Sequence, residues 1–98
     1  MTLTSNVALI LAAWLTPGGA LTESCNIQNA SPPDRWKFIH AYDVATGELV
    51  FARPINGGES RSVTVSGSSI RIEYKFAGDL NYHSAIVTTC KGGNTVRI

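Results

Sequence analysis

Polar and apolar residues alternate along most of the chain after residue 25, and this period of two predicts short β-strands. The clearest segment is "SIRIEYKF", residues 69–76. Its apolar side holds Ile70, Ile72, Tyr74 and Phe76, and its other side holds Arg71, Glu73 and Lys75. We predict that the apolar side faces a core, and that Val63 and Val65 of "SRSVTVS" do the same.

Turn residues separate these segments at short intervals. Gly67 lies in "SGSS", Gly57 and Gly58 lie in "PINGGE", and "KGG" begins at Lys91. The first and the last predict hairpins between neighbouring strands, and the second predicts another chain reversal. About seven short strands without a helix predict an all-β fold, a small antiparallel β-sandwich formed by residues 21–98.

The segment "WKFIHAY", residues 36–42, places a row of aromatic side chains on one face of its strand. The row consists of Trp36, Phe38, His40 and Tyr42. If this row were exposed, Phe38 alone would forfeit about 1.5 to 3 kcal/mol of burial. We therefore predict that Phe38 is in the core and Trp36 and Tyr42 are at its rim, with His40 a neutral, hydrogen-bonded core residue. The alternative is an exposed aromatic platform for sugar rings or a protein partner.

The N-terminal segment has the outline of a secretory signal. An apolar run from Val7 to Leu15 is followed by Pro17, Gly18 and Gly19, and then by Ala20. The run is well short of the roughly 20 residues that cross a bilayer, and small side chains precede a cut after Ala20. We predict a signal peptide at residues 1–20, a secreted or periplasmic mature protein, and no stable membrane insertion after cleavage.

The chain has two cysteines, Cys25 and Cys90, near the two ends of the predicted mature domain. In an exported protein of this size they predict one disulfide. Together with Trp36 they follow the Cys, Trp, Cys order that resembles immunoglobulin-like sandwiches, although position 88 is Thr where those domains carry a tyrosine. The resemblance implies that Trp36 packs on the disulfide, and that a missing first strand leaves one sheet edge open.

Charge and motifs argue against several functional classes. The net charge is +1 and the basic residues are scattered, so we expect no nucleic-acid partner. No nucleophile elbow, phosphate loop or metal-ligand spacing occurs, so we predict no enzyme, no cofactor and no metal. The tripeptide "NAS" at Asn29 is a glycosylation acceptor if the source is eukaryotic.

We therefore predict a small secreted, non-enzymatic binding domain that uses loops on a rigid sandwich. The expected loops are residues 43–48, 55–59 and 77–83, and the partner is an extracellular protein or a glycan. The expected binding residues are Trp36, Tyr42, Asp43, Asp79, Tyr82 and His83. The alternatives are a structural or assembly subunit that forms a homo-oligomer through an open sheet edge, and a small hydrolase or metal enzyme that uses His40 and His83.

Overall fold

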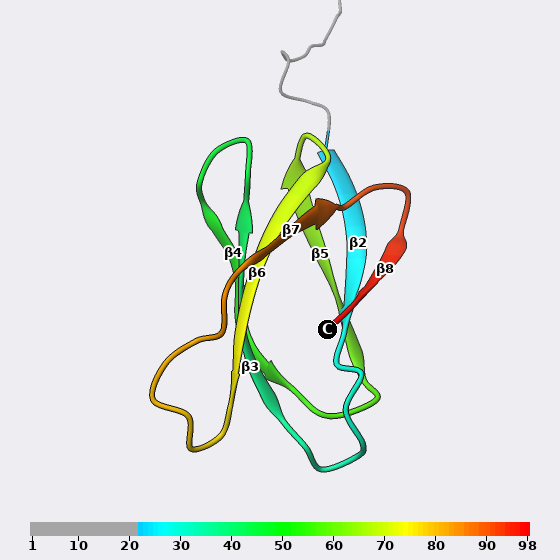
Figure 1. Ribbon diagram of the computed structural model, residues 1–98. Helices are drawn as coiled ribbons and strands as arrows, with labels where there is room; N and C mark the ends of the chain where they lie inside the picture. The colour runs from blue at the N-terminus through cyan, green and yellow to red at the C-terminus, as the bar shows by residue number, and fades with distance from the viewer. Residues whose placement is uncertain (1–21) are drawn as a thin grey trace, which may run out of the picture.

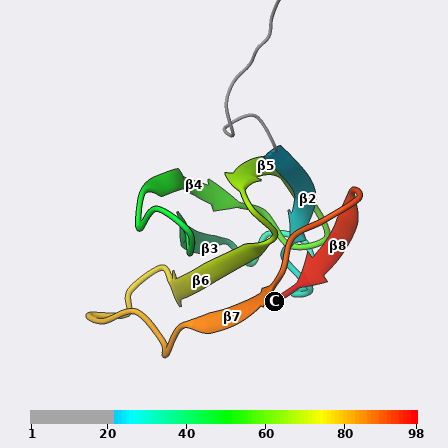
Figure 2. The same cartoon turned by 90° about the horizontal axis from the view of Figure 1, so that it is seen from above.

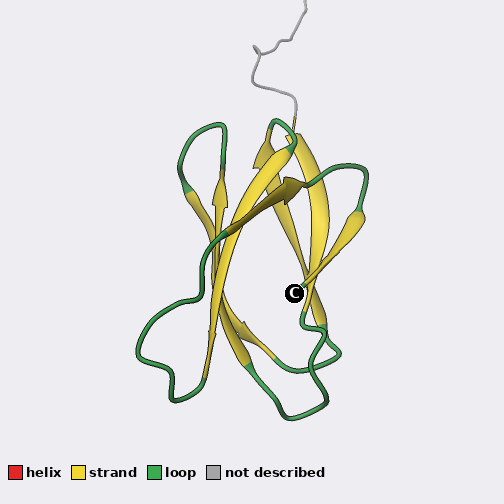
Figure 3. Cartoon of the chain, in the orientation of Figure 1, coloured by secondary structure: helices red, strands yellow, loops and turns green. Residues whose placement is uncertain are grey.

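The computed structural model describes residues 22–98, which form strands and turns with no helix (Figures 1 and 3). The predicted all-β fold is confirmed. The predicted signal peptide, residues 1–20, lies outside the described residues. The strands are β2 (Thr22–Gln28), β3 (Lys37–Asp43), β4 (Leu49–Ile55), β5 (Ser60–Ser66), β6 (Ser69–Phe76), β7 (Ile86–Thr89) and β8 (Asn94–Arg97).

The strands form two sheets that pack face to face as a sandwich (Figure 2). One sheet has the order β5-β2-β8 and the other has the order β4-β3-β6-β7. Every pair is antiparallel except β2 and β8, which run parallel. A parallel pair cannot be joined by a tight turn, so the chain visits the second sheet between these two strands.

Two predicted hairpins are instead crossings between the sheets. Gly67, which has a φ of 101°, lies between β5 and β6, and these strands belong to different sheets. The turn with Gly92 and Gly93 likewise joins β7 of one sheet to β8 of the other. A sharp reversal needs the same glycine conformation whether the next strand pairs with the previous one or crosses the sandwich, so the sequence marks the turn and not the pairing.

The core is built from aliphatic residues and one disulfide. Its buried members are Cys25, Ile27, Ile39, Ala41, Ile55, Val63, Val65, Ile70, Ile72, Cys90 and Val96. The disulfide between Cys25 on β2 and Cys90 just after β7 confirms the predicted pairing, and it joins the two sheets with both cysteines fully buried. With a sequence separation of 65 between the cysteines, the cross-link stabilises the fold by about 4 kcal/mol in the chain-entropy view.

The predicted orientation of the aromatic row on β3 is wrong. Lys37, Ile39, Ala41 and Asp43 are buried, whereas the side chains between them are only partly buried. Phe38 and His40 therefore belong to the outer face of the four-stranded sheet. The interior between the sheets is filled by aliphatic side chains of both sheets, and no aromatic residue is fully buried among residues 22–98.

Trp36 also departs from its expected environment. It directly precedes β3 and is 43% exposed. It does not occupy the buried position that the immunoglobulin resemblance implies for it. We find the sandwich architecture and the disulfide without the tryptophan core.

Asn29 is fully buried in the connection that follows β2. Its Nδ2 donates to the carbonyl oxygens of Arg35 at 2.9 Å and Ile55 at 2.8 Å, and its Oδ1 accepts from Ser31 N at 2.9 Å. An Nδ2 used in this way cannot carry a glycan in the folded domain, so the prediction of a glycan acceptor is wrong. The backbone of Gly57 packs closely against the same connection, because a Cβ there would lie 1.7 Å from the Pro32 carbonyl oxygen.

Candidate binding surface

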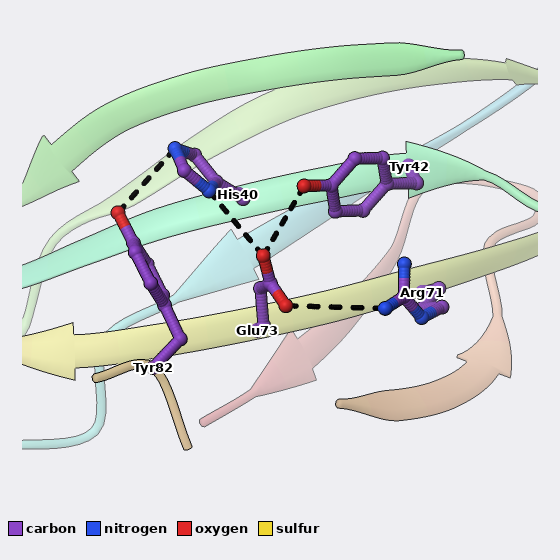
Figure 4. A network of polar contacts seen from close by, with 5 residues as sticks. All are labelled: His40, Tyr42, Arg71, Glu73 and Tyr82. Atoms are coloured by element: carbon purple, nitrogen blue, oxygen red, sulfur yellow. Dashed lines mark hydrogen bonds and ion pairs between the residues drawn. The ribbon is translucent and has the colours of Figure 1, made fainter. Parts of the chain in front are cut away.

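A cluster of aromatic and charged side chains covers the outer face of the four-stranded sheet (Figure 4). β3 supplies His40 and Tyr42, and the paired strand β6 supplies their cross-strand neighbours Glu73 and Arg71. Tyr82 reaches the same face from the loop between β6 and β7. We call these five residues the outer-face cluster.

Glu73 is the centre of the outer-face cluster. Tyr42 Oη donates to its Oε2 at 3.1 Å, and His40 Nδ1 lies 3.4 Å from the same oxygen. Arg71 Nη2 lies 3.9 Å from Oε1, and its guanidinium stands 4.9 Å from the centre of the Tyr42 ring. One carboxylate therefore holds three neighbouring side chains in place on an otherwise open sheet surface.

His40 connects Glu73 to the loop. The Tyr82 ring stacks on the imidazole with centroids 4.5 Å apart, and Tyr82 Oη lies 3.3 Å from His40 Nε2. A neutral imidazole that donates from Nδ1 to Glu73 has a free acceptor at Nε2, which suits the Tyr82 hydroxyl as a donor. The chain of contacts thus fixes the loop against the sheet.

The electrostatics of the cluster follow from this arrangement. Partial burial raises the pKa of Tyr42, and the hydrogen bond and negative charge of Glu73 raise it further. The phenol is therefore a neutral donor throughout the physiological range. The neutral phenol therefore binds Glu73 through a hydrogen bond and adds no second negative charge beside it.

A shallow pocket of about 130 Å³ adjoins the cluster. Phe38, Ala52 and Pro54 contribute apolar surface, and His40 and Tyr82 contribute polar atoms at one side. The side chains of His40 and Tyr82 thus belong to both the cluster and the pocket. The pocket is smaller than typical small-molecule sites, so it suits a single side chain of a partner better than a ligand of its own.

The loop of residues 77–85 is held at its base and free at its tip. Asp79 Oδ2 accepts from Phe76 N at 3.0 Å and lies 3.3 Å from His83 Nε2. His83 stacks on Tyr74 with centroids 4.8 Å apart. Leu80 at the tip is 92% exposed. The loop therefore presents an apolar tip on a fixed base.

Lys37 forms a second group of contacts on the inner side of β3, where it is only 5% exposed. Its Nζ lies 4.7 Å from the centre of the Tyr74 ring and 5.4 Å from that of Phe76. Arg35 stands 4.1 Å from the Phe76 ring centre. Burial, and secondarily the charge of Arg35, lower the pKa of Lys37. The aromatic faces stabilise an ammonium that the interior would otherwise disfavour.

Asp43 is an internal residue at the end of β3, 2% exposed. Its Oδ2 accepts from Ser66 N at 2.7 Å and its Oδ1 accepts from Ala45 N at 3.0 Å, so it ties the β3–β4 turn to β5 of the other sheet. Burial raises the pKa of Asp43, but hydrogen bonds from Ser66, Ala45 and Thr46 outweigh that effect and leave the pKa lowered. Its carboxylate is occupied by the fold.

The structure separates the six residues expected to bind a partner. Tyr42 and Tyr82 meet through His40 and Glu73 in the outer-face cluster, whereas Asp79 and His83 pair at the base of the loop. Trp36 is exposed at the start of β3, and Asp43 is internal. Sequence reasoning missed Glu73 and assigned His40 to the core, because cross-strand pairing depends on a register that alternation alone does not give.

The three loops expected to carry recognition do not gather at one end. Residues 43–48 lie at one end of the sandwich, and residues 55–59 and 77–83 lie at the other (Figure 1). Ile55 and Gly57 are buried. Only the loop of residues 77–85 combines exposure with contact to the outer-face cluster.

Comparisons with protein families, curated proteins and solved structures find no match to this chain. Within residues 22–98, no group of three or more His, Cys, Asp or Glu side chains is placed to hold a metal ion. The same part of the chain holds no helix long and apolar enough to cross a membrane.

Proposed function

We propose that this protein is a non-enzymatic binding module whose contact surface is the outer-face cluster together with the loop of residues 77–85. The observation that carries the proposal is the partly exposed aromatic and charged row on β3 and β6, held in place by Glu73. Accessible side chains that are already ordered lose little conformational entropy on binding, so they suit recognition.

A protein partner fits this surface better than a glycan. Tyrosine and arginine are the residue types that dominate protein interfaces, and Tyr42, Arg71 and Tyr82 lie together here. Exposed aliphatic side chains extend the surface, with Val87 62% exposed on the neighbouring strand β7 and Leu80 at the loop tip. One face of the Tyr82 ring is covered by His40, which leaves less aromatic surface for stacking on a sugar.

The proposed place of action is outside the cytoplasm, in the extracellular space or a periplasm. The buried disulfide supports this proposal, because such bonds persist in oxidising compartments. Signal cleavage after Ala20 remains part of the proposal, and a mature chain beginning at Leu21 is its expected signature in mass spectrometry of the exported protein.

The test is affinity capture from the secreted fraction of the source organism with matched variants. Arg71→Ala should reduce capture of the partner at least about tenfold, as expected for an interface hot spot. Arg61→Ala, which removes an exposed cation from the other sheet, should leave capture unchanged. Both variants should melt within a few degrees of the wild type.

Equal capture by the wild type and both variants would overturn the proposal. A glycan array run in parallel decides the class of partner. Binding to defined glycans that is lost in Tyr82→Ala, without any protein captured, would replace the protein partner by a carbohydrate.

A further inference from the structure

The strand β5 presents the longest regular free edge in the part of the chain that the structure describes. The edge strands are β5 and β8 in the three-stranded sheet, and β4 and β7 in the four-stranded sheet. β7 and β8 have four residues each, and β4 contains Pro54 and faces a register shift at Ala41 and Tyr42. β5 has seven residues, no proline and no register shift. Short strands, prolines and bulges protect edges from pairing, and β5 has none of these.

The direction of the backbone groups on β5 follows from bonds at its two ends. Asn29 N, at the end of β2, donates to Glu59 O, whereas Ser66 N donates to Asp43 Oδ2 in the other sheet. Alternate residues of a strand point their backbone groups the same way. Arg61, Val63 and Val65 therefore bond to β2, and Ser62 and Thr64 direct both N–H and C=O to the free edge.

The bonds on the far side of β2 agree with this alternation. Ser24 O accepts from Gly93 N and Gln28 O accepts from Ile98 N, both on the β8 side. The even-numbered residues of β2 thus bond to β8. Its odd-numbered residues, which include Cys25 opposite Val63, bond to β5.

The side chains along this edge are mostly small and uncharged. Ser60, Ser62, Thr64 and Ser66 are exposed on the outer face of the sheet, and all are small hydroxyl residues. The one charge on the strand is Arg61, whose guanidinium donates to Ser60 O at 2.8 Å. Arg61 covers only the Ser60 end, and the edge at Ser62 and Thr64 carries no charge, so this stretch is a template for another strand.

We propose that β5 is a self-association edge, at which two copies of this chain pair antiparallel about a two-fold axis at Val63. In this register Ser62 of one copy lies opposite Thr64 of the second copy, and the two residues exchange both N–H···O=C bonds. Arg61 lies opposite Val65 of the second copy, so like charges do not meet. The two three-stranded sheets become one continuous sheet.

The occupied backbone groups select this register. Ser66 N is used by Asp43, and Ser60 O is used by Arg61. With the axis at Val63, Ser66 N of one copy faces Ser60 O of the second copy. At each end of the pairing, a single absent bond therefore accounts for both occupied groups. With the axis at Ser62 or at Thr64, each occupied group faces a free one and leaves it without a partner, which costs free energy when the edge is covered.

The test is sedimentation velocity of the purified protein up to about 1 mM, the range of a weak interface. The wild type should show a concentration-dependent dimer. Thr64→Pro removes an N–H at the free edge and should raise the dimer dissociation constant about tenfold or more. Thr95→Pro is the matched control on β8, where alternation from Ile98 N directs the Thr95 N–H away from β2, and it should leave the dimer unchanged.

Oxidative cross-linking tests the register. Ser62→Cys mixed with Thr64→Cys should form a disulfide-linked dimer faster than either variant alone, because the opposed Cα atoms are about 5.5 Å apart and the diagonal ones about 7 to 8 Å. A wild type that stays monomeric to the highest concentration would overturn the proposal. So would a dimer that Thr64→Pro does not weaken, or one that both proline variants weaken equally. Faster linking of Ser62→Cys with itself would reject the axis at Val63.

Discussion

The aliphatic interior of this domain and the outer face of its four-stranded sheet each contain side chains that hydropathy alone would assign to the other region. The interior holds Asn29, Lys37 and Asp43, all at most 5% exposed. The outer face holds the partly exposed aromatic residues of β3. Polar residues are buried in this core where backbone groups or aromatic rings satisfy their polar atoms. Aromatic residues such as Tyr42 lie on the surface where hydrogen bonds order them.

The largest effect is expected where the interior depends on a single amide. Asn29→Asp replaces two donors by an oxygen that faces two carbonyl oxygens, so unfolding should become easier by about 3 kcal/mol or more. Urea unfolding followed by circular dichroism measures the loss. Asn81→Asp, in the exposed loop, should change stability by less than about 0.5 kcal/mol. Equal effects of the two substitutions would contradict the role assigned to Asn29.

The second prediction concerns Asp43. Asp43→Asn places an amide against the donors of Ser66 and Ala45 and should cost about 2 kcal/mol at neutral pH. Because folding lowers the pKa of Asp43 from its ordinary value of 3.8, its carboxylate contributes fully above that pH. The contribution is lost as the pH falls through the folded-state pKa.

The measurement is urea unfolding of the wild type and Asp43→Asn from neutral to acidic pH. The gap between them should close in acid. Asp34→Asn, at an exposed turn position with a φ of 68°, is the control, and its difference from the wild type should not change with pH. A gap independent of pH would show that the charge of Asp43 is not what the fold uses.

A smaller effect is expected in the outer-face cluster. Glu73→Gln removes the negative charge beside Tyr42 and weakens its hydrogen bond, so the pKa of Tyr42 should fall toward its ordinary value of 10.0. The expected cost in stability is about 1 kcal/mol. Ultraviolet titration gives the pKa, with Tyr42→Phe identifying the signal. An unchanged Tyr42 titration would mean that the two side chains do not interact in solution.

Trp36 should show the smallest effect on stability. Trp36→Ala removes a side chain that is 43% exposed and lies outside the core, so the loss should be below about 1 kcal/mol. In a Trp14→Phe background Trp36 is the sole indole, and its emission should resemble that of a water-exposed tryptophan and be quenched by iodide. A blue-shifted, protected emission would return Trp36 to the core.

The sequence predicted the fold well where alternation and burial coincide. Ile70 and Ile72 on β6 and Val63 and Val65 on β5 are buried as expected, and the disulfide forms. The connections between sheets could not be predicted, since a glycine turn has the same local geometry in a hairpin and in a crossing. Pairing in this fold is decided by contacts between segments distant in the sequence.

The candidate site was predicted less well, for a physical reason visible in β3. Both faces of this strand carry apolar side chains, and transfer free energy favours burial of the face with Phe38. The choice was reversed by contacts that hydropathy does not count: the hydrogen bonds of Asp43 inside, and the bonds of Glu73 to His40 and Tyr42 outside. Register brings Glu73 opposite His40, and register follows from the whole sheet.

The comparison of Ile39→Ala with Phe38→Ala by urea unfolding tests most directly that β3 turns its aromatic row outward. Ile39 is 1% exposed and its truncation should cost about 2 to 5 kcal/mol, whereas the half-buried Phe38 should cost at least about 1.5 kcal/mol less. A Phe38→Ala variant as unstable as Ile39→Ala, or less stable, would place the aromatic row in the core and contradict the surface on which the proposed function depends.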